Sequence, residues 1–234
     1  QIHGADLGAH ALKTLVGRNA IPAEDYDDVI FGCLDAIGPL AGNIARTSWL
    51  AAGLPLHVPG VTIDRQCGSS QQAIQFAAQA VMSGTMDMVI AAGVESMTRV
   101  PMGSSAMFHA KEGLGMYKSP GLEEKYPGVM WSQFMGAEMI VKKHGLTKDD
   151  LDRFALLSHL NGKAATEAGA FANEIIGIEI EGPEGTSIHL IDEGIRMDAT
   201  LEGIAGVKLL SEGGALTAAS SSQICDGASA ALIV

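Results

Sequence analysis

One cysteine of this sequence, Cys67, has neighbours that suit nucleophilic chemistry. It lies in DRQCGSSQQA (64–73), where small residues indicate a tight turn. The thiolate is the reactive form of cysteine, and the free N–H groups and positive dipole end of a helix N-terminus favour it. The dipole contributes only about 0.3–1 kcal/mol, so a working nucleophile also needs a base, usually histidine. We predict that Cys67 is a nucleophile; the alternative is a small buried hydrophobic residue.

The residues on either side of Cys67 predict the elements that hold it. Residues 61–64 are β-branched and read as a short strand, and apolar residues recur with helical spacing over 71–83, where Gly84 ends the helix. Residues 86–92 form a second short apolar run. Strand, helix and strand in this order form the unit of a parallel sheet, which places Cys67 at the N-terminus of the helix.

Periodic patterns elsewhere indicate further elements of an α/β fold. Apolar residues at helical spacing predict helices over 5–19, 43–52 and 131–144, and Thr147 with Asp150 predicts a capping box that begins another helix. Strands are expected at 29–33 and 175–180. Residues 99–128 show no sustained period, which indicates an excursion from the sheet, and residues 204–210 are not assigned.

Composition narrows the class of protein. The chain has 234 residues, 47% of them hydrophobic, and a formal net charge of −12 without a basic cluster, which argues against nucleic-acid binding. Three cysteines without a CxxC pair favour a reducing compartment and no metal site. No apolar run has transmembrane length, and no signal peptide opens the chain, so we expect a cytoplasmic protein that does not bind membranes.

Several motifs, in order over nearly the whole chain, resemble those of the thiolase family. Besides the run around Cys67 they are DVIFGC (28–33), GNIARTSWLAAGLP (42–55), MSGTMDMVIAAGVESMT (82–98), MGAE (135–138) and ALTAASSSQICDGASAALIV (215–234). The resemblance implies a CoA-dependent acyltransferase in which Cys67 carries the acyl group as a thioester. It either cleaves 3-ketoacyl-CoA or condenses acetyl-CoA, in fatty-acid or other lipid metabolism.

The resemblance also implies an architecture. We expect a thiolase-like layered fold with a mixed five-stranded sheet and helices on both faces. Residues 1–100 and 211–234 would form the N-terminal core, and 101–210 an inserted loop domain that binds CoA. Thiolases are homodimers or homotetramers, so a homo-oligomer is expected, with coenzyme A or acyl-CoA as substrate and no permanently bound cofactor.

The resemblance assigns roles to single residues. Those expected to contact CoA are Arg196, Leu210, Ala218, Ser222 and Ile224. Met135 matches a methionine of the substrate pocket, and Phe134 stands where acetoacetyl-type thiolases often have histidine, which favours longer or bulkier acyl chains. From their helical spacing alone, Phe134 and Met135 could equally be core residues.

The acid–base groups of the family are expected in a second half that follows Val234. They include a base in a Gly-His-Pro motif, a proton-donating cysteine in a Cys-x-Gly motif and an Asn-Glu-Ala-Phe motif that positions water. Two other interpretations stay open. One is a different condensing enzyme of the same superfamily. The other, if the gene ends at Val234, is a non-catalytic CoA-binding or scaffolding subunit.

Overall fold

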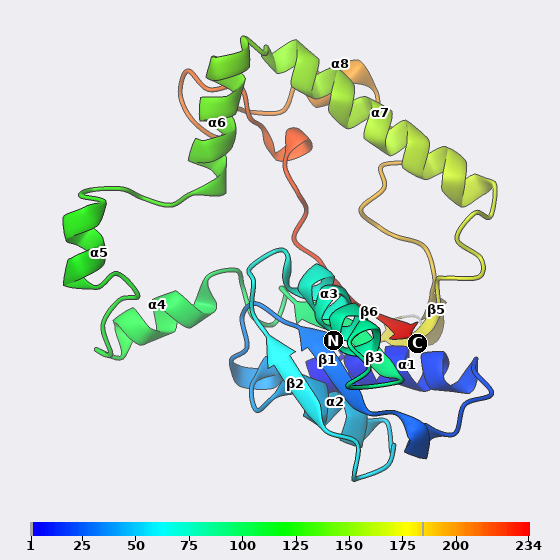
Figure 1. Cartoon of the computed structure of the whole chain (residues 1–234). Coiled ribbons are helices and arrows are strands. Elements are labelled where there is room, and N and C mark those ends of the chain that lie inside the picture. Colours follow the sequence, from blue (N-terminus) through cyan, green and yellow to red (C-terminus); the bar gives the residue numbers. More distant parts are fainter. Residues whose placement is uncertain (1, 184) are drawn as a thin grey trace. The chain divides into compact units, whose positions relative to one another are not determined.

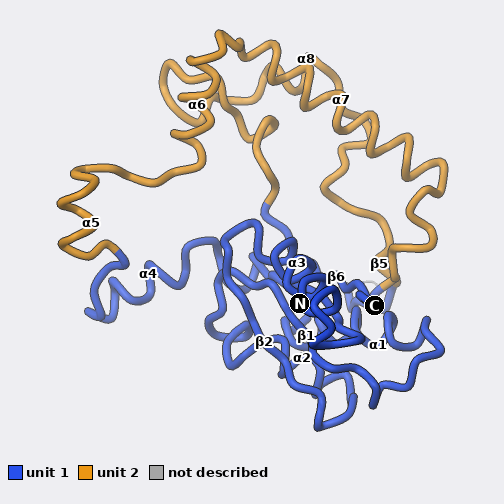
Figure 2. The backbone as a smooth tube through the Cα atoms, in the orientation of Figure 1, with its two compact units in different colours: residues 1–117, 178–187, 224–234 blue, residues 118–177, 188–223 orange. Residues whose placement is uncertain are grey.

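The computed structural model describes residues 2–183 and 185–234, which divide into two compact units (Figure 2). Unit 1 comprises residues 1–117, 178–187 and 224–234, and unit 2 comprises residues 118–177 and 188–223. These boundaries describe compact units and do not test the predicted domain boundaries. The expected loop domain, residues 101–210, stays a prediction.

Unit 1 is built on a mixed sheet with strand order β2-β1-β3-β6 (Figure 1). Strands β1 (Asp28–Gly32), β2 (Gly60–Ile63) and β3 (Val89–Ser96) are parallel, and β6 (Asp226–Ile233) pairs with β3 in the antiparallel sense. The predicted mixed sheet is confirmed. The predicted strand number is wrong for the described residues: their main sheet has four strands, and β4 and β5 make a separate pair.

Helices cover both faces of this sheet. Helices α1 (Gly4–Gly17) and α2 (Ile44–Ala51) pack on one face and α3 (Ser69–Met82) on the other (Figure 1). Alternate residues of β1 point to opposite faces, so Val29 and Phe31 join the α1–α2 core while Ile30 joins the α3 core. A sheet covered on both faces needs apolar residues at nearly every strand position, which explains the short continuous apolar runs of the sequence.

The predicted elements of unit 1 differ from the observed ones mainly at their ends. The helices predicted over 5–19, 43–52 and 71–83 correspond to α1, α2 and α3, and the three parallel strands were all predicted. Residues 99–128, which lack a period, contain two short helices, α4 (Ser104–Lys111) and α5 (Pro120–Lys125). Two 3-10 turns, η1 (Ala23–Asp25) and η2 (Gly38–Leu40), complete this part of the chain.

Unit 2 is mainly helical. It contains α5, α6 (Gln133–His144), α7 (Lys148–Glu167), α8 (Leu201–Ala205) and the 3-10 turn η3 (Ala218–Ser220). The capping box is confirmed, since Thr147 Oγ1 accepts from Asp150 N at 3.2 Å and Asp150 Oδ2 accepts from Thr147 N at 2.8 Å.

A two-stranded sheet joins β4 (Ile178–Gly182) to β5 (Gly185–His189), and the division between the units falls within β5, after Ser187. The strand predicted over 175–180 therefore begins three residues later. None of the helices in the described ranges has both the length and the apolar character needed to cross a bilayer.

Candidate functional site

Cys67 lies in the turn between the end of β2 at Ile63 and the start of α3 at Ser69. Its side chain is exposed, so the alternative that Cys67 is a buried hydrophobic residue is wrong for this structure. Gly68 occupies the N-cap position, and the first backbone N–H groups of α3 follow it directly. Ser69 N donates to Gln66 O at 3.1 Å. Unpaired N–H groups in the first turn of a helix favour negative charge on a nearby sulfur or oxygen.

Ser69 closes the turn that presents Cys67. Its hydroxyl accepts from Arg65 N at 2.9 Å and donates to Gln66 O at 2.6 Å, and the side chain is only 5% exposed. Gln66 has a φ of 49°, in the left-handed region that a non-glycine residue rarely adopts. Asp64 Oδ1 accepts from Gln66 N at 2.7 Å, which holds the same residue from the other side. The residue before Cys67 is thus fixed in a sparsely populated conformation.

Two glycines of neighbouring strands, one at the end of β1 and one inside β3, contact the first turn of α3. Gly32 of β1 and Gly93 of β3 are register partners. A Cβ atom at Gly32 would overlap backbone atoms of Ser69 and Ser70, and one at Gly93 would overlap Ser70 Oγ. Only glycine allows the helix start, and with it Cys67, to lie this close to the strand ends.

Two carboxylates join the loops beyond these strand ends. Glu95 at the end of β3 accepts from Leu34 N at 2.8 Å and Asp35 N at 3.4 Å. Asp35, only 2% exposed, accepts from Gly103 N at 2.8 Å and from Ser105 N and Oγ at 3.0 and 2.6 Å. Sequence reasoning missed both residues, because their partners lie about 60 to 70 positions away in the chain.

The electrostatics of Cys33 separate it from Cys67. Cys33 is buried, with its Sγ 4.0 Å from Glu95 Oε1. Burial raises the pKa of the Cys33 thiol to about 12, and the negative charges of Glu95, Asp35 and Asp64 add to the rise. A thiol with this pKa stays protonated at neutral pH and is not a nucleophile. This environment gives Cys33 a structural role.

Cys225 immediately precedes β6. Its carbonyl oxygen accepts from Met97 N at 3.4 Å. Although Cys225-Asp226-Gly227 has Cys-x-Gly spacing, Asp226 accepts from Thr98 N and Oγ1 at 3.0 and 2.6 Å, which fastens the start of β6 beside the end of β3. These contacts give the segment a structural role.

Three histidine rings have structural hydrogen bonds. His3 Nδ1 accepts from Ala5 N at the start of α1, His57 Nε2 lies 2.9 Å from Glu24 O, and His159 Nδ1 accepts from Arg196 N. None of these bonds involves Cys67. Within residues 2–183 and 185–234, no group of three or more His, Cys, Asp and Glu side chains could hold a metal ion.

In unit 2, helix α7 holds the segment that carries Arg196. His159 Nδ1 accepts from Arg196 N at 3.2 Å, and Lys163 Nζ donates to Met197 O at 2.9 Å. The Arg196 side chain is exposed and so can reach a ligand. His159 is therefore a candidate for positioning Arg196, and its partner lies 37 positions away in the chain.

The other predicted CoA contacts of unit 2 lie on one hydrogen-bonded stretch. Leu210 N donates to Leu216 O at 2.9 Å, and the buried Thr217 caps η3, which begins with Ala218. Gln223, next to Ser222, donates from Nε2 to Gly194 O at 2.5 Å, two residues before Arg196. The structure therefore brings Arg196, Leu210, Ala218 and Ser222 onto connected segments of unit 2.

The remaining predicted residues lie elsewhere. Ile224 belongs to unit 1 and is 67% exposed. Phe134 and Met135, in the first turn of α6, are 41% and 55% exposed, so in unit 2 as described they do not form a core. Their accessible apolar surface is compatible with a role in ligand binding, which stays a prediction.

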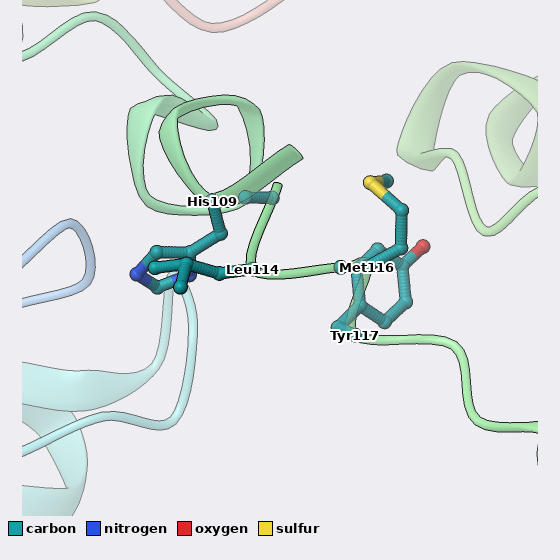
Figure 3. Close-up of a pocket in the computed structure, with 6 residues that line it drawn as sticks. His109, Leu114, Met116 and Tyr117 are labelled. Carbon is teal, nitrogen blue, oxygen red and sulfur yellow. The ribbon is translucent and has the colours of Figure 1, made fainter. Parts of the chain in front are cut away.

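A hollow of about 280 Å³ beside α4 shares no residue with the predicted site. His109 and Leu114 line it together with Met116 and Tyr117 (Figure 3). The lining is mainly apolar and includes neither a nucleophile nor a carboxylate, so we assign no chemistry to it.

Comparison with known proteins gives consistent matches. Residues 1–234 match the family model described as "Thiolase, N-terminal domain". The chain is 50% identical to the steroid 3-ketoacyl-CoA thiolase FadA6 of Mycobacterium tuberculosis, over 99% of this chain and 56% of that protein. It is 39% identical to the 3-ketoacyl-CoA thiolases of Photorhabdus laumondii and Shewanella frigidimarina, over all of this chain and 58% and 59% of those proteins. The chain thus spans less than two thirds of the curated relatives it matches.

Proposed function

Because this chain belongs to the thiolase family, we propose that the full-length protein is an acyl-CoA acyltransferase that works through an acyl-Cys67 intermediate. One observation carries the proposal: Cys67 is an exposed thiol on a constrained turn at the N-terminus of α3, whereas Cys33 is buried with a pKa raised to about 12. Only a thiol that can ionise and reach substrate can accept an acyl group.

The proposed reaction has two halves. In the cleavage direction, Cys67 Sγ attacks the ketone carbon of 3-ketoacyl-CoA, and the bond from this carbon to the α-carbon breaks. The bonding electron pair leaves with acetyl-CoA, whose α-carbon takes up a proton, while the acyl group stays on sulfur as a thioester. The thiol of a second CoA then attacks the thioester, releases acyl-CoA and restores Cys67. In condensation, the carbanion of acetyl-CoA, instead of the CoA thiol, attacks an acetyl thioester on Cys67.

The helix N-terminus has a defined part in this chemistry. Each attack converts a carbonyl oxygen into an oxyanion, and backbone N–H groups at the start of α3, with that of Cys67, are suited to stabilise it. Removing one such donor in other enzymes costs about 10²–10³ in turnover. The rigid seating of α3 on Gly32 and Gly93 supports this role, because preorganised donors lose little energy to reorientation.

We propose that unit 2 binds the CoA portion of the substrate. Arg196 offers a cation for the phosphorylated adenine end, and Ala218 and Ser222 lie on the exposed loop predicted to contact the pantetheine arm. Leu210, 48% exposed, supplies apolar surface beside this loop, and Ile224 follows it in the chain. A local cation matters here because the net charge of −12 does not attract an anionic substrate.

A long or bulky acyl group is the proposed substrate class. Phe134 and Met135 present accessible apolar surface at the start of α6. A relative that is 50% identical is named a steroid 3-ketoacyl-CoA thiolase, which supports an acyl group larger than acetoacetyl. The protein would act as a homodimer or homotetramer in the cytoplasm, where reducing conditions keep the Cys67 thiol free.

The test is acylation of the full-length protein, followed by intact mass after mixing with an acyl-CoA. We expect one acyl group on Cys67 in the wild type, and a loss of turnover of about 10³-fold or more in Cys67→Ala. Cys225→Ala, which removes another exposed thiol, is the matched control and should acylate normally. Turnover that survives Cys67→Ala would contradict the proposed mechanism.

CoA binding is tested separately with Arg196→Ala. The dissociation constant for CoA should rise about tenfold, as expected for loss of a charge-assisted contact. Arg153→Ala, on the exposed face of α7 where Arg153 pairs with Asp149, should leave CoA affinity unchanged. Equal CoA affinities of the two variants would show that Arg196 is an ordinary surface charge.

A further inference from the structure

Glu138 of α6 binds a segment 77 residues further along the chain. Its Oε1 accepts from Ala215 N at 3.0 Å and from Leu216 N at 2.9 Å, and its Oε2 lies 3.1 Å from Ala215 N. A carboxylate that accepts from consecutive backbone N–H groups makes strong, directional bonds. Ala215 and Leu216 are only 8% and 7% exposed, so these bonds are partly shielded from water.

The segment has space for this carboxylate only because residue 214 is glycine. A Cβ atom at Gly214 would overlap Glu138 Oε1 and Ser211 Oγ, and would lie 3.0 Å from Glu138 Cδ. The bend at 211–214 and the carboxylate of Glu138 therefore fit each other without any side chain between them. This fit is independent of the hydrogen bonds and indicates the same docking arrangement.

The bound segment continues into the loop proposed to contact CoA. Leu216 O accepts from Leu210 N, and Thr217, fully buried, accepts from Ala219 N and Ser220 N at 3.2 and 3.3 Å. A shift of Leu216 is therefore transmitted to Leu210 on one side and to the η3 turn on the other.

Glu138 itself lies on α6, the helix proposed to contact the acyl group. Phe134 and Met135 precede Glu138 by four and three residues, so all three lie on one side of α6. The face that binds the CoA loop is thus the face that carries the predicted acyl-pocket residues.

We infer that Glu138 is a positioning residue that sets the CoA-contacting loop in place beside the acyl-contacting face of α6. The inference rests on the proposed function, since it gives Glu138 a purpose in binding CoA thioesters. It also gives a role to the last residue of the MGAE motif, for which none was predicted.

Calorimetric titration of CoA into the full-length protein tests the inference. Glu138→Gln keeps the size of the side chain but removes its charge and one acceptor oxygen. We expect the dissociation constant for CoA to rise about tenfold, the loss expected for one charge-assisted hydrogen bond. Glu167→Gln, at the exposed end of α7, is the control and should bind CoA as the wild type does. Hydrogen exchange at the backbone N–H groups of Ala215 and Leu216 should accelerate in Glu138→Gln but not in Glu167→Gln.

Gly214→Ala gives a second route to the same result. Its methyl group would displace the Glu138 carboxylate, so CoA affinity should fall to a similar extent, and the double variant should be no worse than the poorer single variant. If Glu138→Gln does not fold, the affinity of Gly214→Ala decides: a wild-type value overturns the inference, and a weakened one supports it.

The outcomes separate the inference from the proposed function. If the wild type binds CoA and Glu138→Gln binds it equally well, the positioning role is wrong and the proposed function stands. If the wild type does not bind CoA, both are wrong. Weaker binding in Glu138→Gln but not in Glu167→Gln, with faster exchange at residues 215 and 216, supports the inference.

Discussion

Replacement of Gly32 by alanine should disturb Cys67 from the face of the sheet that α3 covers. The added Cβ would overlap Ser70 N and Ser69 C and lie 2.7 Å from Ser70 Cα. All three are backbone atoms of the first turn of α3, so no change of rotamer can relieve the overlap. Carbon atoms in contact lie about 3.5–4.0 Å apart, so the helix start must retreat by about 1 Å.

Both stability and reactivity should respond to this shift. Overpacking of a well-packed site typically costs about 1–3 kcal/mol in the free energy of unfolding. A misplacement of about 1 Å at a reacting group can cost about 10²-fold in rate. We therefore expect Gly32→Ala to fold with reduced stability and to acylate Cys67 about 10²-fold more slowly than the wild type.

The assay is urea unfolding of the full-length protein, with the rate of Cys67 acylation followed by intact mass. Gly17→Ala is the matched control, because no atom lies within 4 Å of the Cβ position at this helix end. Gly93→Ala offers a comparison, since its main overlap is with the Ser70 side chain and should be partly relieved by Ser70→Gly. Wild-type stability and acylation in Gly32→Ala would refute the idea that this glycine seats α3.

Two further predictions concern titrating groups. At pH 8 a thiol reagent should modify Cys67 at least about 100-fold faster than Cys33, because burial raises the pKa of Cys33 to about 12 and leaves little thiolate. Unfolding in urea should abolish this difference. Equal modification rates in the folded protein, measured by peptide mass spectrometry, would contradict the prediction. Asp27 accepts from Asp87 N and Met88 N, with the bond from Met88 the main cause of its lowered pKa. Its stabilisation is therefore present above the unfolded pKa and lost as the pH falls through the lower native value. Asp27→Ala should lower the free energy of unfolding by about 1 kcal/mol at pH 7, a small value because the carboxylate is exposed. In urea unfolding, this difference from the wild type should vanish well below about pH 4, where the carboxylate is protonated. A difference that persists at low pH would exclude the Asp27 carboxylate as its source.

The local elements and the position of Cys67 between them could be predicted from sequence because their signals are local. Helical spacing located α3, β-branched residues located β2, and the small residues between them located the turn of Cys67. The capping box at Thr147 was predicted for the same reason, as it needs only a hydroxyl and a carboxylate three residues apart. Short helices α4 and α5 were missed, since six to eight residues are too few to establish a period.

The tertiary structure decided what depends on residues far apart in the chain. The sequence determined that a cysteine, Cys67, follows a strand and precedes a helix, and that the chain has thiolase motifs in order. Only the folded chain sets Gly32 beside Gly93 under the first turn of α3, pairs β6 with β3 in the antiparallel sense, and brings Glu138 to the N–H groups of residues 215 and 216. A periodic pattern specifies which face of an element is apolar, but the partner that covers this face or accepts a given hydrogen bond is selected by packing of the whole chain.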